Sequence, residues 1–457
     1  MMNEPNELTS CLSKHQAMSM RRRQFLRTTA TASAALTAVP LFGAESITKY
    51  RTALVGCGWW GMNILNEAMA AGKSKVVALC DVDQSRLDAA AKKVGKDADE
   101  KPRVYTHYLD LLERERPEIV IVATPDHWHP LVMVDAVKAG AHVYVEKPIS
   151  HTILEGRAMV NAARKYGRVV QVGTHRRVSP HNISAMEFLR SGKAGKIGSV
   201  RAFVSYGGGP ERPTKNSDPP EGLDWDRWCG PAPLRNFNKL IHPKGFRQFL
   251  DFANGQIGDW GIHWLDQILW WTEEKYPRRV FSTGGRPIRG PAINLKDYQT
   301  TDAPDTQVAA FEFESFTAVW EHRLYAGNEA EKGENVGCHF YGTAGTFHLG
   351  WLQGWTFYPV DKNQPIIHEP AKLNEPDGQN IKELWADFLR CIQTNAKPVC
   401  DIEIGYRSTN MSLLAMISLK TGRSLQWDGD KEIIVGDDYA NTLLKREYRR
   451  GYVHPVA

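Results

Sequence analysis

The chain has 457 residues, of which 42% are hydrophobic and 24% charged, so we expect a soluble globular protein with more than one domain. The 57 basic and 52 acidic residues leave a net charge of only +5, and four arginines stand together near the N-terminus: Arg21, Arg22, Arg23 and Arg27. With no basic stripe and no nucleic-acid motif, no nucleic-acid partner is expected. Of the seven cysteines, Cys11 lies in a segment that is expected to be removed. The other six lack zinc-ligand spacing and are expected as buried free thiols, in preference to a Cys391–Cys400 disulfide.

The N-terminal segment has the form of an export signal. Residues Arg22 to Arg27 fit the pattern R-R-x-F-L-K/R, and an uncharged, weakly apolar stretch follows from Thr28 to Ala44. This stretch is too short and too polar to span a membrane, and with the twin arginines it resembles a twin-arginine translocation (Tat) signal. We therefore expect residues 1–45 to be a Tat-type signal, the protein to be periplasmic or otherwise exported, and no later segment to span a membrane. A disordered basic tail is the less favoured alternative.

A glycine loop follows the first expected strand. Arg51 to Val55 is a short apolar run, Gly56-Cys57-Gly58-Trp59-Trp60-Gly61 follows it, and Met62 to Ala71 is predicted as a helix. G-x-G-x-x-G between a strand and a helix is typical of dinucleotide binding, because the glycines allow a tight turn, close approach of the pyrophosphate and close helix packing. The helix N-terminus then faces the phosphates.

Asp81 ends the second expected strand, Lys75 to Cys80, about 20 residues after the loop, where an acid accepts hydrogen bonds from the adenosine ribose. A carboxylate there repels a 2′-phosphate, so NAD is favoured over NADP, although Arg86 lies nearby. A helix N-cap is the less favoured role for Asp81.

Strands and helices then alternate: a helix ending over Asp110–Glu115, a strand over Glu118–Ala123, a helix over Leu131–Ala139 and a strand over His142–Val145. This alternation predicts parallel βαβ units, hence a Rossmann domain with a doubly wound parallel sheet over residues 48–170. Loops at the carboxyl ends of its strands line the cofactor crevice. Two such loops stand out, Thr124 to His129 and Glu146-Lys147-Pro148.

The pattern changes after about Ser150. Val200 to Tyr206 and Thr306 to Glu321 alternate as half-exposed antiparallel strands do. The predicted fold class is α/β: the Rossmann domain is followed by a C-terminal α+β domain, residues 171–430, with a large, mostly antiparallel sheet. Residues 431–457 are expected to be a tail that packs on both domains.

Residues 207–245 are irregular and rich in Gly, Pro and Asn, which is typical of a functional segment such as a lid. Several aromatic residues lie in or near it, and aromatic faces suit a carbohydrate. At least half of them are expected in the core instead. The residues are Tyr206, Trp225, Trp228, Phe237, Trp260 and Trp264.

Four features in order resemble the glucose–fructose oxidoreductase / inositol dehydrogenase (Gfo/Idh/MocA) family: the glycine loop, Asp81, the Thr-Pro-x-x-x-His of residues 124–129 and the Glu-Lys-Pro of residues 146–148. Residues Gly258 to Asp266 resemble the family's D-x-x-x-H helix, and the tail resembles that of exported members. The resemblance implies an NAD(P)-dependent oxidoreductase acting on a hydroxyl of a sugar, glycoside or cyclitol. It places three residues around the reacting carbon: Lys147, Asp259 and His263.

These residue types suit that chemistry. A histidine with an ordinary pKa near 6.5 can act as a general base, which is the role expected for His263. Asp259, four residues earlier on the predicted helix, can orient the imidazole or bind a second hydroxyl. The Lys147 ammonium can stabilise developing negative charge on the reacting oxygen. An ordinary i, i+4 pair and a solvated loop lysine remain the alternatives.

The expected cofactor-binding residues are Gly56, Gly58, Trp59, Trp60, Gly61, Asp81, Arg86, Thr124, Pro125, His129, Glu146 and Lys147. The expected substrate-binding residues are His175, Arg176, Tyr206, Trp260, Asp259 and His263. His127 and His129 flank Trp128, but without a third ligand at recognised spacing no metal is expected.

Export would separate the protein from any pool of free NAD, so we expect a tightly bound NAD that is recycled in place as one substrate is oxidised and another reduced. One alternative is an NAD-dependent glycoside hydrolase that works by transient oxidation, elimination and re-reduction. A second is a non-catalytic sugar- or cofactor-binding protein. The family's sheets often pair face to face, which implies a homo-oligomer by analogy.

Overall fold

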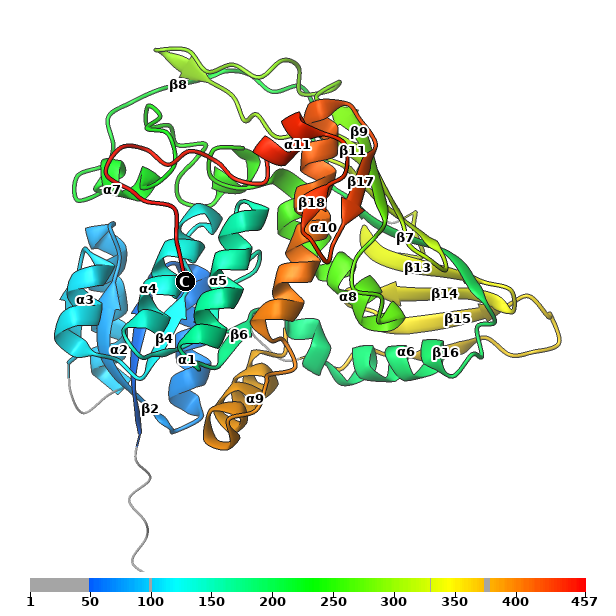
Figure 1. Ribbon diagram of the computed structural model, residues 1–457, viewed down its shortest axis with the longest axis horizontal. Coiled ribbons are helices and arrows are strands. Elements are labelled where there is room, and N and C mark those ends of the chain that lie inside the picture. The colour runs from blue at the N-terminus through cyan, green and yellow to red at the C-terminus, as the bar shows by residue number, and fades with distance from the viewer. Residues whose placement is uncertain (1–48, 98–100, 329, 374–378) are drawn as a thin grey trace, which may run out of the picture. The chain divides into compact units, whose positions relative to one another are not determined.

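The computed structural model describes residues 49–97, 101–328, 330–373 and 379–457. The predicted export signal, residues 1–45, lies outside them. The described residues form an N-terminal domain around a parallel sheet and a C-terminal domain around a larger mixed sheet (Figure 1). The predicted fold class is therefore confirmed.

The N-terminal sheet has six parallel strands in the order β3-β2-β1-β4-β5-β6. Its strands are β1 (Tyr50–Val55), β2 (Ser74–Cys80), β3 (Arg103–Tyr105), β4 (Ile119–Val122), β5 (His142–Val145) and β6 (Val170–Val172). Every residue of β4 is buried, as expected for a central parallel strand covered on both faces. The strand order reverses between β1 and β4, and this switch point is where doubly wound sheets bind ligands. The Rossmann domain was predicted to end at residue 170, which is the first residue of β6. Because β6 belongs to the parallel sheet, the domain extends slightly beyond the predicted boundary.

Five helices alternate with these strands: α1 (Trp59–Ala70), α2 (Gln84–Asp97), α3 (Tyr108–Glu115), α4 (His129–Lys138) and α5 (Ile153–Lys165). Helix α1 begins at Trp59 rather than at Met62, because Gly58 already serves as its N-cap. The first turn of α1 therefore lies within the glycine loop, and its free backbone N–H groups are available to phosphates.

The C-terminal sheet has ten strands in the order β16-β15-β14-β13-β7-β12-β11-β9-β17-β18. They are β7 (Ile197–Ser205), β9 (Arg279–Gly285), β11 (Thr306–Glu312), β12 (Thr317–Arg323), β13 (Val336–Gly342), β14 (Gly345–Gly350), β15 (Trp355–Pro359), β16 (Ile367–Glu369), β17 (Leu425–Asp428) and β18 (Ile433–Ile434). Strands β7 and β12 pair parallel, and the other pairs are antiparallel. The alternation predicted over 306–321 is the hairpin β11–β12.

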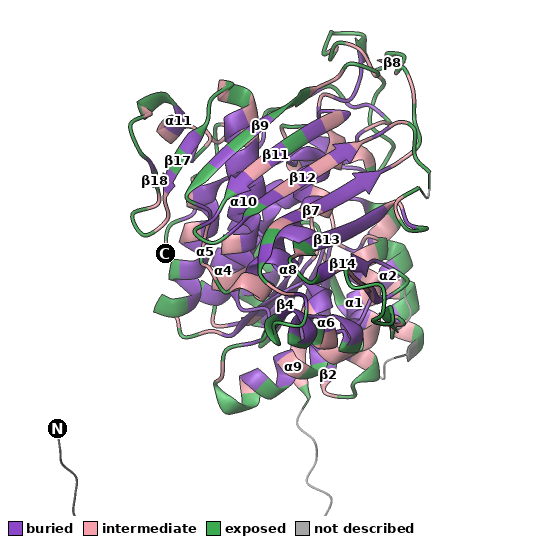
Figure 2. Ribbon diagram, turned by 90° about the vertical axis from the view of Figure 1, so that its right-hand side faces the viewer, coloured by how far each residue is buried: buried purple, intermediate pink, exposed green. Residues whose placement is uncertain are grey.

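Helices cover one face of this sheet and join it to the N-terminal domain (Figure 1). They are α6 (Pro180–Arg190), α8 (Ile262–Thr272) and α10 (Ile402–Thr421), whereas α9 (Ile381–Thr394) packs against α1 of the N-terminal domain. Helix α10 packs against α5, α8 and β9, so it contacts both domains. The opposite face of the sheet is turned toward the viewer in Figure 2, with half-buried and exposed residues along β9 and β11.

The segment between β7 and α8 builds a second hydrophobic core. It contains β8 (Thr214–Lys215), α7 (Trp225–Cys229) and the 3-10 turn η3 (Gly245–Gln248), and β8 pairs with β10 (Tyr298–Gln299). Trp225 and Trp228 stack at 4.6 Å between ring centroids, and Phe237 meets Trp225 edge-on. Three of the six aromatic residues considered for carbohydrate binding therefore lie in this core, and Trp264 is buried in the main core.

The C-terminal tail crosses both domains, drawn red in Figure 1 with its short helix α11 (Asp438–Thr442). Arg446 Nε donates to Glu155 Oε1 at 2.9 Å, and the Tyr448 hydroxyl donates to the same oxygen at 2.7 Å. Farther along, Arg449 Nη1 donates to Asp226 Oδ2 at 2.6 Å. The tail thus ties α5 to the second core.

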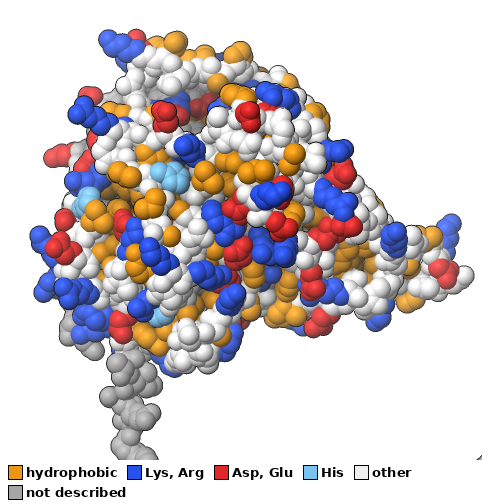
Figure 3. All heavy atoms as spheres, viewed as in Figure 1, with side chains coloured by type: hydrophobic (Ala, Val, Ile, Leu, Met, Phe, Trp, Pro, Cys, Tyr) orange, Lys and Arg blue, Asp and Glu red, His pale blue; other side chains and the backbone are white. Residues whose placement is uncertain are grey.

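Among the described residues no helix is long and apolar enough to cross a membrane. Six cysteines lie in the described ranges, and all are buried and free, as predicted. Lys, Arg, Asp and Glu side chains are interspersed on the face shown in Figure 3.

We expect Glu155→Gln to lower the free energy of unfolding by about 3–5 kcal/mol at neutral pH, because it breaks the ion pair between the fully buried Glu155 and the largely buried Arg446. Burial would raise the pKa of Glu155, but Arg446, His151 and Tyr448 outweigh burial and hold that pKa at about 2. The folded pKa thus lies below the unfolded value of about 4.3, so this stabilisation is complete above that pH and is lost as the pH falls toward 2.

Urea denaturation of wild type and variant between pH 7 and pH 3 measures this effect. Arg423→Ala serves as the control, because Arg423 is 52% exposed and pairs with Asp437 at the surface. A Glu155→Gln protein as stable as the control variant at pH 7 would contradict the role given to the buried pair.

Candidate active site

A cavity of about 440 Å³ opens at the carboxyl ends of β1, β4 and β5, where the two domains meet. Its walls include the glycine loop and Asp81 at one end, and Lys147, Asp259 and His263 at the other. Every residue predicted to bind the cofactor lines it. The cavity therefore joins the dinucleotide fingerprint to the predicted reacting end.

The glycine loop leaves no room for side chains at its first and last positions. Gly56 has φ +97°, and a Cβ there would lie 2.5 Å from the carbonyl oxygen of Ala123. A Cβ on Gly61 would lie 2.2 Å from the carbonyl oxygen of Gly56. The backbone thus forms the close turn that a pyrophosphate needs, and the loop fits a dinucleotide.

Asp81 stands beside this loop and helps to hold it. Its Oδ2 accepts the Cys57 N–H at 2.7 Å and its Oδ1 accepts the Asp83 N–H at 3.0 Å. Burial raises the pKa of Asp81, while these two N–H groups oppose the rise. Arg86, which could have drawn a 2′-phosphate, pairs with Asp83 at 3.2 Å.

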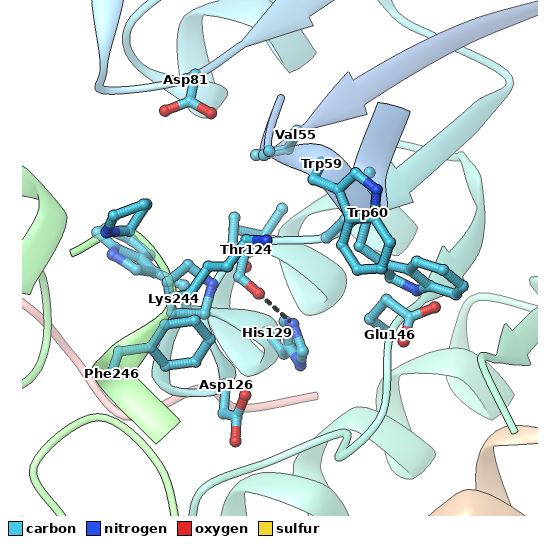
Figure 4. Close-up of a pocket in the computed structure, with 18 of the residues that line it drawn as sticks. Val55, Trp59, Trp60, Asp81, Thr124, Asp126, His129, Glu146, Lys244 and Phe246 are labelled. Atoms are coloured by element: carbon cyan, nitrogen blue, oxygen red, sulfur yellow. Dashed lines mark hydrogen bonds between the residues drawn. The ribbon is translucent and has the colours of Figure 1, made fainter. Parts of the chain in front are cut away.

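His129 links the two loops that follow β4 and β5. Its Nδ1 lies 2.8 Å from the carbonyl oxygen of Pro148, and its Nε2 lies 2.7 Å from that of Thr124 (Figure 4). Burial lowers the pKa of His129 to about 4, so the ring is neutral and one nitrogen donates at a time. This histidine fixes the relative positions of the loops that carry Thr124 and Lys147.

Glu146 is buried beneath the cavity. Burial raises its pKa to about 7, despite the opposing charge of Lys147. The Lys147 backbone N–H donates to Glu146 Oε2 at 3.1 Å, and the Tyr144 hydroxyl donates to Oε1 at 3.4 Å. His175 Nε2 lies 3.7 Å from Oε1. Glu146 therefore anchors the loop that presents Lys147.

Lys147 reaches from the end of β5 to the C-terminal domain. Its Nζ donates to the backbone oxygen of Asp259 at 2.8 Å and to Asp259 Oδ1 at 2.9 Å. Asp259 lies in a π-helical turn, Ile257–Gly261, directly before α8. Such turns recur at functional sites and alter the side-chain directions of a regular helix. Here the Asp259 side chain pairs with Lys147, whereas the His263 ring packs against Trp260 and Trp351.

The His263 imidazole lies among indole rings, 5.8 Å from Trp260 and 5.0 Å from Trp351 between centroids. Burial, followed by the charge of Lys147, lowers the pKa of His263 well below the value near 6.5 expected from sequence. The imidazole is therefore neutral across the physiological range, with one ring nitrogen as donor and the other as acceptor.

A short segment of the C-terminal domain, residues 242–247, covers the cavity, and we call it the strap. Lys244 Nζ lies over the Trp59 ring, 5.2 Å from its centroid. Figure 4 shows Lys244 and Phe246 entering from the C-terminal domain beside Thr124. At the far end of the strap, Arg247 Nε donates to Asp259 Oδ1 at 3.1 Å. The strap overlaps the end of the segment interpreted as a lid, residues 207–245, and extends two residues beyond it, but its position could not be predicted.

Three predicted substrate residues do not line this cavity among the described residues. His175 packs edge-on against Trp60 at 5.5 Å, and Tyr206 packs against Trp260 at 6.0 Å. The Arg176 guanidinium lies 3.7 Å from the centroid of the Trp351 ring. All three support cavity-lining side chains from behind.

Sequence reasoning missed Trp351, Asp126, Lys244 and Arg247, which do line the cavity. Trp351 follows β14 and carries no motif, so no local signal could have identified it. Asp126 stood inside the Thr-Pro-x-x-x-His run but at a variable position of that pattern. Burial raises its pKa to about 7.

No group of three or more metal-ligating side chains occurs within the described ranges. His127, one of the two histidines weighed as ligands, lies in the second core, with its Nε2 3.0 Å from the carbonyl oxygen of Trp228. Burial lowers the pKa of His127 well below its ordinary value.

Residues 50–174 match the Gfo/Idh/MocA oxidoreductase family, NAD-binding Rossmann fold, and residues 205–281 and 364–454 match the C-terminal α/β domain of the same family. Together these matches cover more than half of the chain. The chain therefore belongs to the Gfo/Idh/MocA oxidoreductase family.

Curated relatives include glycosyl hydrolase family 109 protein 1 of Shewanella sp. (strain ANA-3), 26% identical over 151 residues, which are 32% of this chain and 33% of that protein. D-apiose dehydrogenase of Paraburkholderia graminis is 29% identical over 170 residues, 36% of this chain and 44% of that protein. The chain thus spans well under two thirds of these relatives. The solved structure of a levoglucosan dehydrogenase with NADH and levoglucosan shares the fold, with TM-score 0.64, 17% identity and coverage of 83% of this chain and 99% of that one.

Proposed function

We propose that this protein is an NAD-dependent oxidoreductase that acts on a hydroxyl-bearing carbon of a sugar, glycoside or cyclitol. The observation that carries the proposal is the convergence of Lys147, Asp259 and His263 at one end of a cavity whose other end is the glycine loop. Membership of an oxidoreductase family and similarity to D-apiose dehydrogenase support it.

Oxidation of a secondary alcohol removes a hydride and a proton, and bound NAD supplies the hydride acceptor. The Lys147 ammonium is placed to donate to the substrate oxygen and to stabilise negative charge there. His263 lines the cavity together with Lys147, and its neutral imidazole is the group we assign as proton acceptor. Asp259 lines the cavity, and its carboxylate can accept a hydrogen bond from a second hydroxyl. Trp260 and Trp351 also line the cavity.

We further propose that the cofactor is a resident prosthetic group. The strap supports this, because Lys244 and Phe246 cover the cavity from the C-terminal domain. Export in folded form, with the cofactor already loaded, would also require NAD to be recycled in place. NAD rather than NADP is favoured because the Asp81 carboxylate occupies the ribose end while Arg86 is paired with Asp83.

A second candidate is an NAD-dependent glycoside hydrolase, in which transient oxidation of a glycoside permits elimination of its aglycone before re-reduction. The similarity to glycosyl hydrolase family 109 proteins favours it. The third candidate, a non-catalytic sugar- or cofactor-binding protein, is disfavoured because Lys147, Asp259 and His263 are all present at the cavity.

The purified protein is expected to carry about one NAD(H) per chain, released on denaturation, and its nicotinamide absorbance should change and recover as candidate sugars are added in turn. An aryl glycoside separates the two enzymatic candidates, because the hydrolase alone releases the phenol.

Lys147→Ala should lower the rate of the spectral change by at least about 100-fold, as expected for loss of a donor to the reacting oxygen, while NAD stays bound.

Lys138→Ala is the matched control, because Lys138 is an exposed lysine of α4 outside the cavity. A purified protein without nucleotide whose spectrum never responds to sugars would refute the enzymatic proposals. Bound NADP in place of NAD would refute the assignment to Asp81, and unchanged rates in Lys147→Ala would refute the role of that lysine.

We also propose export through the Tat pathway, on the pattern of Arg22 to Arg27 and the weakly apolar stretch that follows. Replacing Arg22 and Arg23 by lysine keeps the charge and removes the twin arginines, so the variant protein should remain in the cytoplasm. Cell fractionation measures this, with the wild-type chain as reference. Unchanged recovery from the periplasm would contradict the proposal.

A homo-oligomer is proposed through the outer face of the large sheet. On that face Phe281 of β9 is 44% exposed and Val308 of β11 is 43% exposed, which is typical of a surface that a second copy covers. Light scattering should give a multiple of the 51.4 kDa chain mass, less any removed signal, and Val308→Asp should dissociate the assembly. Val453→Asp, at an exposed position in the tail, should leave it intact; a monomeric wild type would refute the proposal.

A further inference from the structure

Arg247 holds the same carboxylate oxygen that Lys147 holds. Arg247 Nε lies 3.1 Å from Asp259 Oδ1, and Lys147 Nζ lies 2.9 Å from it. The two cations come from different parts of the fold, the strap and the end of β5. One oxygen of Asp259, a residue that lines the cavity, is therefore fixed from two directions.

The strap is anchored along its length, so Arg247 is not a freely moving side chain. Its Nη1 donates to the carbonyl oxygen of Lys244 at 3.2 Å, and its guanidinium lies 4.6 Å from the centroid of the Phe246 ring. Phe246 belongs to the second core, and Lys244 lies over Trp59. These contacts hold the guanidinium in the direction of Asp259.

The shared oxygen bears on the chemistry proposed for Lys147. If Asp259 had Lys147 as its sole counter-ion, turning the ammonium toward a substrate oxygen would leave a buried carboxylate uncompensated, which is costly. With Arg247 on the same oxygen, the carboxylate keeps a counter-ion when Lys147 turns. A guanidinium suits this task because it stays charged and its donors have fixed directions.

We propose that Arg247 is a positioning residue: it orients and charge-balances Asp259 so that Lys147 is free to engage the reacting oxygen. This inference rests on the oxidoreductase function proposed above. It concerns a residue outside the Glu-Lys-Pro and D-x-x-x-H patterns, and it gives the strap a part in catalysis as well as in covering the cofactor.

Three charged or titratable groups act on Asp259: Lys147 from the end of β5, Arg247 from the strap and Asp126 from the loop after β4. Burial would raise the pKa of Asp259, but Lys147 and Arg247 together outweigh burial and lower it. Asp126 also faces Arg247, and burial raises the pKa of Asp126 to about 7. Arg247 thus stands between two buried carboxyl groups.

The direct test follows the ionisation of Asp259 by ¹³C NMR of aspartate carboxyl groups in the NAD-bound protein, with Asp259→Asn and Asp126→Asn to assign the signals. In wild type the pKa of Asp259 should lie below the ordinary aspartate value. In Arg247→Met its pKa should rise by at least about one unit, because a neighbouring cation lowers a carboxyl pKa by roughly 1–3 units. In Arg247→Lys the pKa of Asp259 should return most of the way to its wild-type value, because lysine keeps the positive charge. This variant provides the test if Arg247→Met folds poorly.

Turnover supplies the second readout. In Arg247→Met, kcat should fall by about 10- to 100-fold, the effect of losing a charge-assisted hydrogen bond, with KM for the sugar little changed. The acid limb of the pH dependence of kcat should move to higher pH in Arg247→Met. Arg247→Lys should partly restore both the value of kcat and the position of this acid limb. Arg423→Met, at a surface pair, is the control.

An unchanged Asp259 pKa in Arg247→Met would overturn the proposal. So would a raised KM with an intact kcat and pH profile, which would make Arg247 a substrate-binding residue instead. A wild type that oxidises no sugar, but in which Arg247→Met still raises the Asp259 pKa, would refute the proposed oxidoreductase function while leaving the positioning of Asp259 by Arg247 supported.

Discussion

The ion pair between Lys147 and Asp259 is the interaction on which the candidate active site depends. Lys147 stands at the carboxyl end of β5 in the parallel sheet, and Asp259 stands in the π-helical turn before α8, so their 2.9 Å contact joins the two domains where the cavity runs between them. Both side chains are largely buried, and separating them would leave uncompensated charge in a poorly solvated site. The chemistry proposed for the site therefore needs the two domains in this arrangement, with Arg247 as a second cation on the carboxylate.

The sequence was sufficient for the fold class and for the cofactor end of the cavity because those signals are local. The glycine loop lies between a strand and a helix, and Asp81 follows the next strand, so neighbours in sequence establish both. Lys147, Asp259 and His263 came from the family resemblance, and the structure brings them to one end of one cavity. Their catalytic roles remain predictions.

What could not be predicted depends on contacts between distant parts of the chain. Trp351 follows a strand of the large sheet and reaches His263 only through the tertiary fold. The strap lies in an irregular segment without a motif, and its position over Trp59 depends on the second core. The lowered pKa of His263 comes from burial and from Lys147, neither of which its sequence neighbours reveal.

The central claim is that the cavity holds NAD and a sugar together, with Lys147 and His263 at the reacting carbon. A crystal structure of the protein with NAD and a sugar that changes its absorbance tests this most directly. We expect one hydroxyl of the sugar to lie within hydrogen-bonding distance of both Lys147 Nζ and His263, with the pyrophosphate at the glycine loop Gly56–Gly61. A sugar bound away from both side chains, or a dinucleotide bound elsewhere, would contradict the account.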